Sequence, residues 1–231
     1  MEIGTINLFK FNLLGKTFYL TNTFYAILFS GTVFMFFFAL LGYSVKHGKP
    51  KILANFGEII YSILHNFVVT NMGEEGERFI PFIGTLFGYL LISNLLGLLS
   101  PLGIPWIVSP NIDLSVTLGA AITGILYVQW IAIYSKGVVG YIKHFFKPYP
   151  LMFPINLLEE IVKPFSLSVR LFGNIFGEHI VYEVTFTLIK FGVPVVVMIL
   201  GIFTGTIQAY VFSMLIMVYL SEILGLKKGG H

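Results

Sequence analysis

Cysteine is absent from this sequence of 231 residues, and charged residues are scarce. Without cysteine the chain can form no disulfide, no CxxC redox motif and no thiolate metal site. Only 11% of the residues are charged, whereas 56% are hydrophobic and the mean hydropathy is +0.88. A soluble domain of this length carries more charge and less apolar surface. The composition therefore predicts an integral membrane protein.

Several functional motifs are also missing from the sequence. It has no phosphate-binding P-loop, no recognisable hydrolytic triad and no histidine pair at metal-ligand spacing. The 14 lysines and arginines stand as scattered singles and pairs between apolar runs, which argues against a basic face for nucleic acid. We therefore expect no bound nucleotide, cofactor, metal or nucleic acid, and no catalytic site in this chain.

Long charge-free runs predict the fold class, because a membrane-spanning helix needs about 20 apolar residues. A further segment, residues 52–72, has apolar residues at three- and four-residue steps with Glu58 and His65 between them, which favours a position in the membrane interface. We predict an all-α membrane protein with about five transmembrane helices and one interfacial amphipathic helix, forming a single integral membrane domain over residues 1–231. The predicted spans are 20–45, 79–100, 113–135, 154–190 and 193–224.

The last two predicted helices are joined only by KFGVP, residues 190–194, so they must form an antiparallel hairpin. The first of them, residues 154–190, would be about 50 Å long, against about 30 Å for the hydrocarbon core. We expect the excess length to be absorbed by a strong tilt or curve. A tilted helix would present one face to a large neighbour over many turns.

Basic residues predict the orientation, because they mark the cytoplasmic side of a span. Lysines follow the first and third predicted spans and end the chain, which places the amino terminus outside and the carboxyl terminus in the cytoplasm. These lysines are Lys46, Lys49, Lys51, Lys136, Lys143, Lys147, Lys227 and Lys228.

Arg170 is the only charged residue between positions 164 and 177, inside the fourth predicted span. An arginine at membrane depth costs roughly 2.5–3.5 kcal/mol on insertion scales, so it indicates a functional partner or an aqueous cavity. Two plainer alternatives stay open, a side chain that snorkels to the headgroups and a structural pair with an acid. At about 100° per residue, one polar stripe around Arg170 contains Glu159, Lys163, Ser166, Asn174 and Gly177.

A second group of polar residues follows on the same helix and on the last one. Glu178, His179, Tyr182 and Glu183 lie on other sides of the helix, and a histidine near two carboxylates suits a proton relay. The alternative is a helix end that reaches the headgroups. On the last helix Thr204 and Gln208 share a face, and the Gln208 amide is expected to hydrogen-bond near Arg170. Asn94, in the second span, is expected to bond a neighbouring helix.

The segment PFSLSVRLFGNIFGEH, residues 164–179, closely resembles subunit a of the bacterial rotary F-type ATP synthase. The family signature, a serine-leucine pair and then an arginine followed by LFGN, corresponds to Ser166, Leu167 and residues 170–174. The segments ISNLLGLLSPLG (92–103), SPNIDLSVTLGAA (109–121) and GTIQAYVFSMLIMVYLSE (205–222) are also similar.

The resemblance implies a stator subunit in the bacterial plasma membrane that couples movement of H⁺ or Na⁺ to rotation of a ring of c subunits and ATP synthesis. It implies b subunits of a peripheral stalk as further partners, and two offset half-channels. Arg170 would be the essential arginine that faces the carboxylates of the c-ring. The family has an acid or a histidine nine positions after this arginine, which corresponds to His179 here. In some members a second acid or histidine, on the last helix, faces that residue. This chain has Gly201 at the second position. The relay partner of His179 is left open.

The main alternative to a stator is a stand-alone secondary transporter or channel with a substrate site at Arg170. Many transporters are built from repeated halves with broken helices, and this sequence has no matching halves. A third alternative is a non-conducting assembly subunit. The choice between H⁺ and Na⁺ and the number of c subunits are not specified by this sequence.

Overall fold

The computed structural model describes residues 7–13, 16–47, 51–97, 109–146, 149, 151, 153–189 and 192–225. Its long helices occupy the predicted apolar segments, and the predicted all-α membrane fold is confirmed. Two short 3₁₀ helices, η1 (Glu74–Phe79) and η2 (Pro110–Ile112), precede the third and fourth long helices. The long helices are α1 (Asn22–His47), α2 (Lys51–Met72), α3 (Ile80–Gly97), α4 (Leu114–Phe145), α5 (Phe153–Leu188) and α6 (Val193–Leu224).

Ahead of α1 the chain forms a β-hairpin that the sequence analysis did not predict. Strands β1 (Asn7–Leu13) and β2 (Lys16–Thr21) pair antiparallel, from the Leu13–Lys16 pair at the turn to the Asn7–Thr21 pair at the open end. The missed signals were the alternation of apolar and polar residues in FKFNL and the threonines and aromatic residues of KTFYLT, which are typical of strands. The hairpin leads directly into α1.

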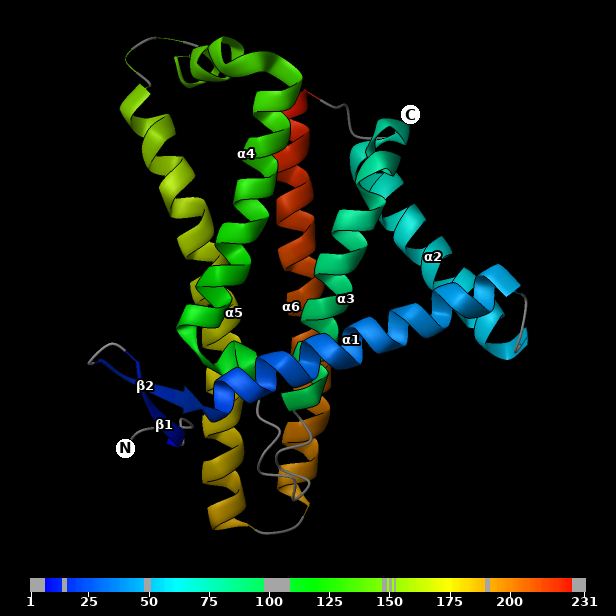
Figure 1. Cartoon of the computed structure of the whole chain (residues 1–231), viewed down its shortest axis with the longest axis vertical. Coiled ribbons are helices and arrows are strands. Elements are labelled where there is room, and N and C mark those ends of the chain that lie inside the picture. Colours follow the sequence, from blue (N-terminus) through cyan, green and yellow to red (C-terminus); the bar gives the residue numbers. More distant parts are fainter. Residues whose placement is uncertain are drawn as a thin grey trace.

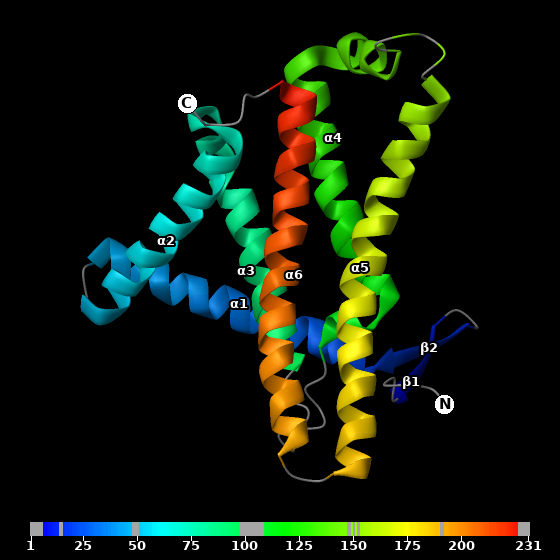
Figure 2. The ribbon, with the colours of Figure 1, turned by 180° about the vertical axis from the view of Figure 1, so that it is seen from behind.

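Helices α3, α4, α5 and α6 run alongside one another, each in the opposite direction to the one before it (Figure 1). The short connection after α5 makes α5 and α6 an antiparallel pair. From behind, α5 and α6 stand in front of α3 and α4 (Figure 2). Helix α1 crosses this bundle, and α2 slants away from it (Figure 1). One broad side of the α5–α6 pair is therefore left without a cover from the described helices.

The core lies where α3, α4, α5 and α6 meet. A glycine on α4 permits close approach to α6: a Cβ added at Gly124 would lie 2.8 Å from Cδ1 of Ile216 on α6. Gly119, also on α4, has nothing within 4 Å and does not take part. Among the fully buried side chains are Ile83 and Leu90 of α3, Val128 of α4, Leu167 and Leu171 of α5, and Phe212, Ile216 and Met217 of α6.

Helix α4 changes direction at Gly137, whose φ of 68° and ψ of 163° lie outside the helical region. Glycine adopts such a positive φ without a steric penalty, which other residues do not. The predicted end of this span, residue 135, lies just before the bend. The segment after the bend leaves the bundle at one end (Figure 1).

Five helical segments of the described chain are long and apolar enough to cross a membrane, namely Thr23–His47, Lys51–Met72, Glu74–Gly97, Leu114–Tyr141 and Val193–Leu224. This set includes α2, which we predicted to lie in the interface, and leaves out α5. Helix α5 falls short because its 36 residues carry four glutamates, a lysine and an arginine. The interfacial position of α2 and the crossing of α5 therefore stay predictions.

Candidate functional site

Arg170 lies on α5 at the edge of its uncovered side. The buried side of the helix carries Leu167, Ser168 and Leu171, and the Ser168 hydroxyl lies 2.9 Å from the Thr117 hydroxyl of α4. Arg170 itself is exposed. Among the residues that the structure describes, no acid pairs with its guanidinium and no group hydrogen-bonds to it. The alternative of a structural pair with an acid of the same chain therefore has no support here.

The side of α5 and α6 that faces away from α3 and α4 is called the open face below. The exposed side of α5 on either side of Arg170 in sequence carries apolar side chains: Phe165 is 58% exposed and Val169 41%. On α6, Phe203 and Ile207 are 67% and 54% exposed. A guanidinium in such an apolar surface is poorly solvated unless a partner or a water-filled space lies next to it.

Lys163, two turns before Arg170 on the same stripe, has the opposite environment. Its side chain is buried, and its ammonium lies 4.9 Å from the centre of the Tyr219 ring of α6. Gln129 of α4 donates to Glu160 and accepts from the Tyr141 hydroxyl. The carboxylate oxygens around the Lys163 ammonium belong to Glu160 at 3.1 Å, Glu159 at 3.2 Å and Glu222 at 3.9 Å.

This arrangement, the lysine cage, connects α4, α5 and α6 and gives the Lys163 ammonium carboxylate partners within the chain. The sequence places Lys163 and Glu159 on the polar stripe around Arg170. The contributions of Gln129, Tyr141 and Glu222 could not be predicted, because no local pattern shows that α4 and α6 bring these side chains to α5. Lys163 and Arg170 are thus two cations on one helix, of which only the first is enclosed by carboxylates.

A pocket of about 270 Å³ lies between α5 and α6 on the carboxyl-terminal side of Arg170. Its polar lining is Asn174, Glu178 and Thr204, and glycine and aliphatic residues complete it. The Thr204 hydroxyl lies 3.3 Å from a carboxylate oxygen of Glu178 and 3.2 Å from the carbonyl oxygen of Gly201. The structure therefore brings three of the predicted site residues together in one cavity.

His179 and Glu183 form a separate pair on α5. The Nε2 atom of His179 lies 3.4 Å from Oε1 of Glu183, one turn further along the helix, and neither residue lines the pocket. Glu178 and His179 are neighbours in sequence but point about 100° apart around a helix. Tyr182 is partly buried and stacks on Phe186. The predicted relay group is thus divided between two sides of α5.

The remaining predicted residues lie on the α3–α6 contact and on the open face. Gln208 is buried, but among the described residues it makes no hydrogen bond with Arg170. The Asn94 amide donates to the carbonyl of Gly205 at 2.9 Å, so this asparagine does bond a neighbouring helix. Ser166 is exposed on the turn of α5 before Arg170.

Comparison with known proteins decides the family. A family model described as ATP synthase A chain matches residues 23–221. The chain belongs to the ATP synthase subunit a family. Subunit a of Moorella thermoacetica is 42% identical over 180 residues, which cover 78% of each chain. Chloroplastic subunit a of Stigeoclonium helveticum is 37% identical over 202 residues, 83% of this chain and 79% of the relative. For subunit a of Syntrophobacter fumaroxidans the identity is 39% over 175 residues, 74% and 71% of the two chains.

Subunit a is a membrane component of the Fo sector of ATP synthase, which agrees with the several apolar helices of this chain. Asn111 of η2 is a further polar residue of this subunit a that could not be singled out from the sequence. Its amide donates to Asn94 Oδ1 at 2.7 Å and to the Ser93 hydroxyl at 3.3 Å, deep in the core. The available signal was a pair of polar residues, Ser109 and Asn111, in the otherwise apolar segment 101–112.

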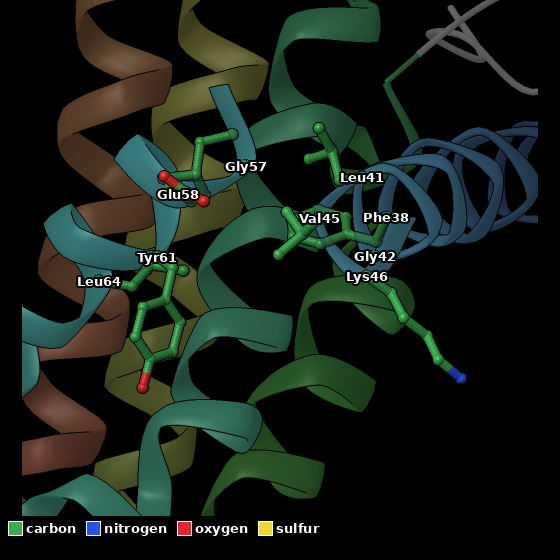
Figure 3. Close-up of a pocket in the computed structure, with 10 residues that line it drawn as sticks. Phe38, Leu41, Gly42, Val45, Lys46, Gly57, Glu58, Tyr61 and Leu64 are labelled. Atoms are coloured by element: carbon green, nitrogen blue, oxygen red, sulfur yellow. The ribbon is translucent and has the colours of Figure 1, made fainter. Parts of the chain in front are cut away.

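A second pocket of subunit a, about 460 Å³, lies between α1 and α2 (Figure 3). Phe38, Leu41, Val45 and Leu64 make it largely apolar. The Lys46 ammonium points away from it in Figure 3. None of the predicted site residues belongs to α1 or α2, so this pocket is separate from the candidate ion site.

Proposed function

We propose that this subunit a is the stator that couples ion translocation to rotation of a c-ring, with Arg170 as the fixed cation that the ring carboxylates meet. The observation that carries the proposal is the exposed, unpaired guanidinium on the apolar open face. Within the described residues the same chain encloses its other α5 cation, Lys163, in carboxylates. An arginine without a partner in its own subunit suits a partner supplied from outside.

A fixed cation next to a moving carboxylate favours the ionised form of that carboxylate. At a separation of about 4 Å and an effective dielectric constant of 20, two unit charges interact with about 4 kcal/mol. That energy corresponds to a lowering of the carboxylate pKa by about three units. A ring carboxylate would therefore release its ion beside Arg170 and bind another only after it has moved on, which blocks direct leakage between the two sides.

The two half-channels are proposed at opposite ends of the α5–α6 pair. The pocket with Asn174, Glu178 and Thr204 lies toward the loop after α5, the end that the basic residues assign to the exterior. The lysine cage lies toward the cytoplasmic end. Arg170 stands between them, about 12 Å along the helix from Glu178 and about 10 Å from Lys163.

Tilt of α5 and α6 would bring a long face of the pair to the ring. Helix α5 has 36 residues, or about 54 Å, which exceeds the hydrocarbon core of about 30 Å. Helix α1 crosses α5 and α6 in both views (Figures 1 and 2). If α1 follows the membrane normal, α5 and α6 lie obliquely, in support of the predicted tilt.

The proposed setting is a bacterial plasma membrane, with the amino terminus outside and the carboxyl terminus in the cytoplasm. The c-ring would contact the open face, and b subunits of the peripheral stalk would bind elsewhere on the subunit. The translocated ion is H⁺ or Na⁺, which ATP-driven transport by the whole complex with and without sodium distinguishes.

The test replaces Arg170 in the complete ATP synthase. Arg170→Ala is expected to abolish ATP synthesis and ATP-driven ion pumping in membrane vesicles, and Arg170→Lys to impair both severely because lysine has a different hydration and geometry. Arg78→Ala is the matched control, since Arg78 is an exposed arginine of η1 outside the site. Copurification with the c-ring verifies assembly. Normal synthesis by an assembled Arg170→Ala complex would refute the proposal.

A further inference from the structure

The proposed function leaves open which group of α5 brings the ion to the ring, because Glu178, His179 and Glu183 all follow Arg170 on the same helix. Their environments in the structure are different. Glu178 faces α6, and the other two residues bond to each other on α5. This difference allows one of them to be chosen.

Glu178 is the only ionisable residue in the described lining of the α5–α6 pocket. It is partly buried, and one of its carboxylate oxygens lies 3.3 Å from the Thr204 hydroxyl across the helix contact. Glycines at 173 and 177 keep the cavity open next to it, since a Cβ added at either would meet nothing within 4 Å. The carboxyl group therefore borders a space of about 270 Å³, enough to hold several water molecules.

The position of Glu178 relative to Arg170 is also favourable. Arg170, Asn174 and Glu178 follow one another at four-residue spacing, so they occupy successive turns of α5, about 6 Å apart along the axis and about 40° apart around it. Asn174 lines the same pocket. A continuous polar line therefore runs from the cavity toward the arginine.

His179 does not share this line. It lies about 180° around the helix from Arg170, and its Nε2 atom is held 3.4 Å from the Glu183 carboxylate. On the α6 side, Gly201 is buried and supplies only its carbonyl, which competes with Glu178 for the Thr204 hydroxyl. Helix α6 thus contributes a hydroxyl and no titratable group to the pocket.

From this geometry we infer that Glu178, with Thr204 as its positioning residue, carries the proton through the exterior half-channel, and that the His179–Glu183 pair lies outside the path. The inference rests on the proposed stator function. In the step, the Glu178 carboxylate takes a proton from hydronium in the pocket, which leaves water and a neutral carboxyl group. The carboxyl group then gives the proton, through water near Asn174, to an ionised ring carboxylate, and Glu178 returns to its anionic form.

Passive proton conduction tests this inference in membranes that contain the complete Fo sector and have been stripped of the catalytic sector. Glu178→Gln keeps the size of the side chain and its contact with Thr204 but cannot exchange a proton. We expect it to lower conduction about tenfold or more, the scale on which loss of a positioned acid–base group acts. His179→Gln, the matched control at the neighbouring position, should conduct within about twofold of the unmodified protein.

Two further variants separate proton transfer from a structural effect. Glu178→Asp retains a carboxyl group and should recover part of the conduction that Glu178→Gln loses, which a merely structural role of the side chain would not produce. Thr204→Val should slow conduction less than Glu178→Gln, because it removes only the positioning hydroxyl. Copurification with the c-ring shows that each variant assembles.

Two results would overturn the assignment. One is conduction by assembled Glu178→Gln at the level of the unmodified protein, and the other is a block in His179→Gln with Glu178→Gln unaffected. In both cases the stator function would still stand, because Arg170→Ala in the complete ATP synthase tests that function independently.

Discussion

Asn94 holds α3 against α6 through the longest-range side-chain hydrogen bond of the described core. Its amide donates to the carbonyl of Gly205 at 2.9 Å, and its own oxygen accepts from Asn111 at 2.7 Å. A Cβ added at Gly205 would lie 3.2 Å from the Cβ of Asn94, so the two backbones are already close. Asn94→Ala would remove both hydrogen bonds and leave the helices in place.

The expected loss of stability follows from what each partner keeps. Interhelical hydrogen bonds in membranes contribute about 0.6 kcal/mol on average and about 1.7 at most, so two bonds give about 1.2–3.4 kcal/mol. The Gly205 carbonyl keeps its bond within α6, and Asn111 keeps its contact with the Ser93 hydroxyl at 3.3 Å. The lower part of the range applies, and we expect Asn94→Ala to reduce the free energy of unfolding by about 1–2 kcal/mol.

The measurement is unfolding of the purified subunit in bicelles by titration with sodium dodecyl sulfate. Thr85→Val is the control, because the Thr85 hydroxyl is exposed on α3 and bonds only to Pro81 of the same helix. Asn94→Ala combined with Asn111→Ala should be less destabilising than the sum of the two single variants, since they share a bond. A change below about 0.3 kcal/mol for Asn94→Ala would show that Asn94 does not hold α3 to α6. Strict additivity of the pair would show that the bond between Asn94 and Asn111 contributes nothing to stability.

Two other substitutions test the packing and the lysine cage. Gly97→Ala would place a Cβ 2.5 Å from Cβ of Ser109, so it should destabilise the bundle by about 1–3 kcal/mol. Gly119→Ala, whose added Cβ has nothing within 4 Å, should be neutral or stabilise by up to about 1 kcal/mol. The same unfolding titration compares the two variants. Lys163→Met removes the cation that pairs with the largely buried Glu160, at a cost of about 3 kcal/mol, and should lower the yield of complex that copurifies with the c-ring. Glu160→Gln added to Lys163→Met should restore part of that yield, and no restoration would argue against charge pairing as the cause.

Much of the fold could be predicted because the apolar runs are long and basic segments separate them. Helices α1, α3, α4 and α6 follow such runs directly. The hairpin ahead of α1 was missed because its strands are short and their alternation is easily outweighed by the search for spans. For α2 and α5, the balance of charge and apolarity lies between that of a span and that of an interfacial helix, so composition does not decide their place.

The candidate site was predictable in its residues but not in their grouping. Arg170 stands out from the sequence alone, because a charge in an apolar run is costly wherever the helix points. Glu178 and His179 are adjacent, and sequence cannot say which of them faces α6, since that depends on the rotation of α5 in the bundle. The role of Asn111 also depends on tertiary packing, because its amide reaches Asn94 only when η2 is packed against α3.

The contrast between Lys163 and Arg170 shows what a stator needs besides its arginine. An unpaired charge about 10 Å from Arg170 would act on a ring carboxylate with about 1.7 kcal/mol at an effective dielectric constant of 20. An interaction of that strength would favour the ionised carboxylate away from Arg170 as well, so the ion would be released over a wider range of ring positions. The closest carboxylate, that of Glu160 at 3.1 Å, pairs with the charge of Lys163 within the subunit. The Lys163–Glu160 pair would therefore help to confine ion release to Arg170, and Glu160 would contribute to coupling without touching the ring.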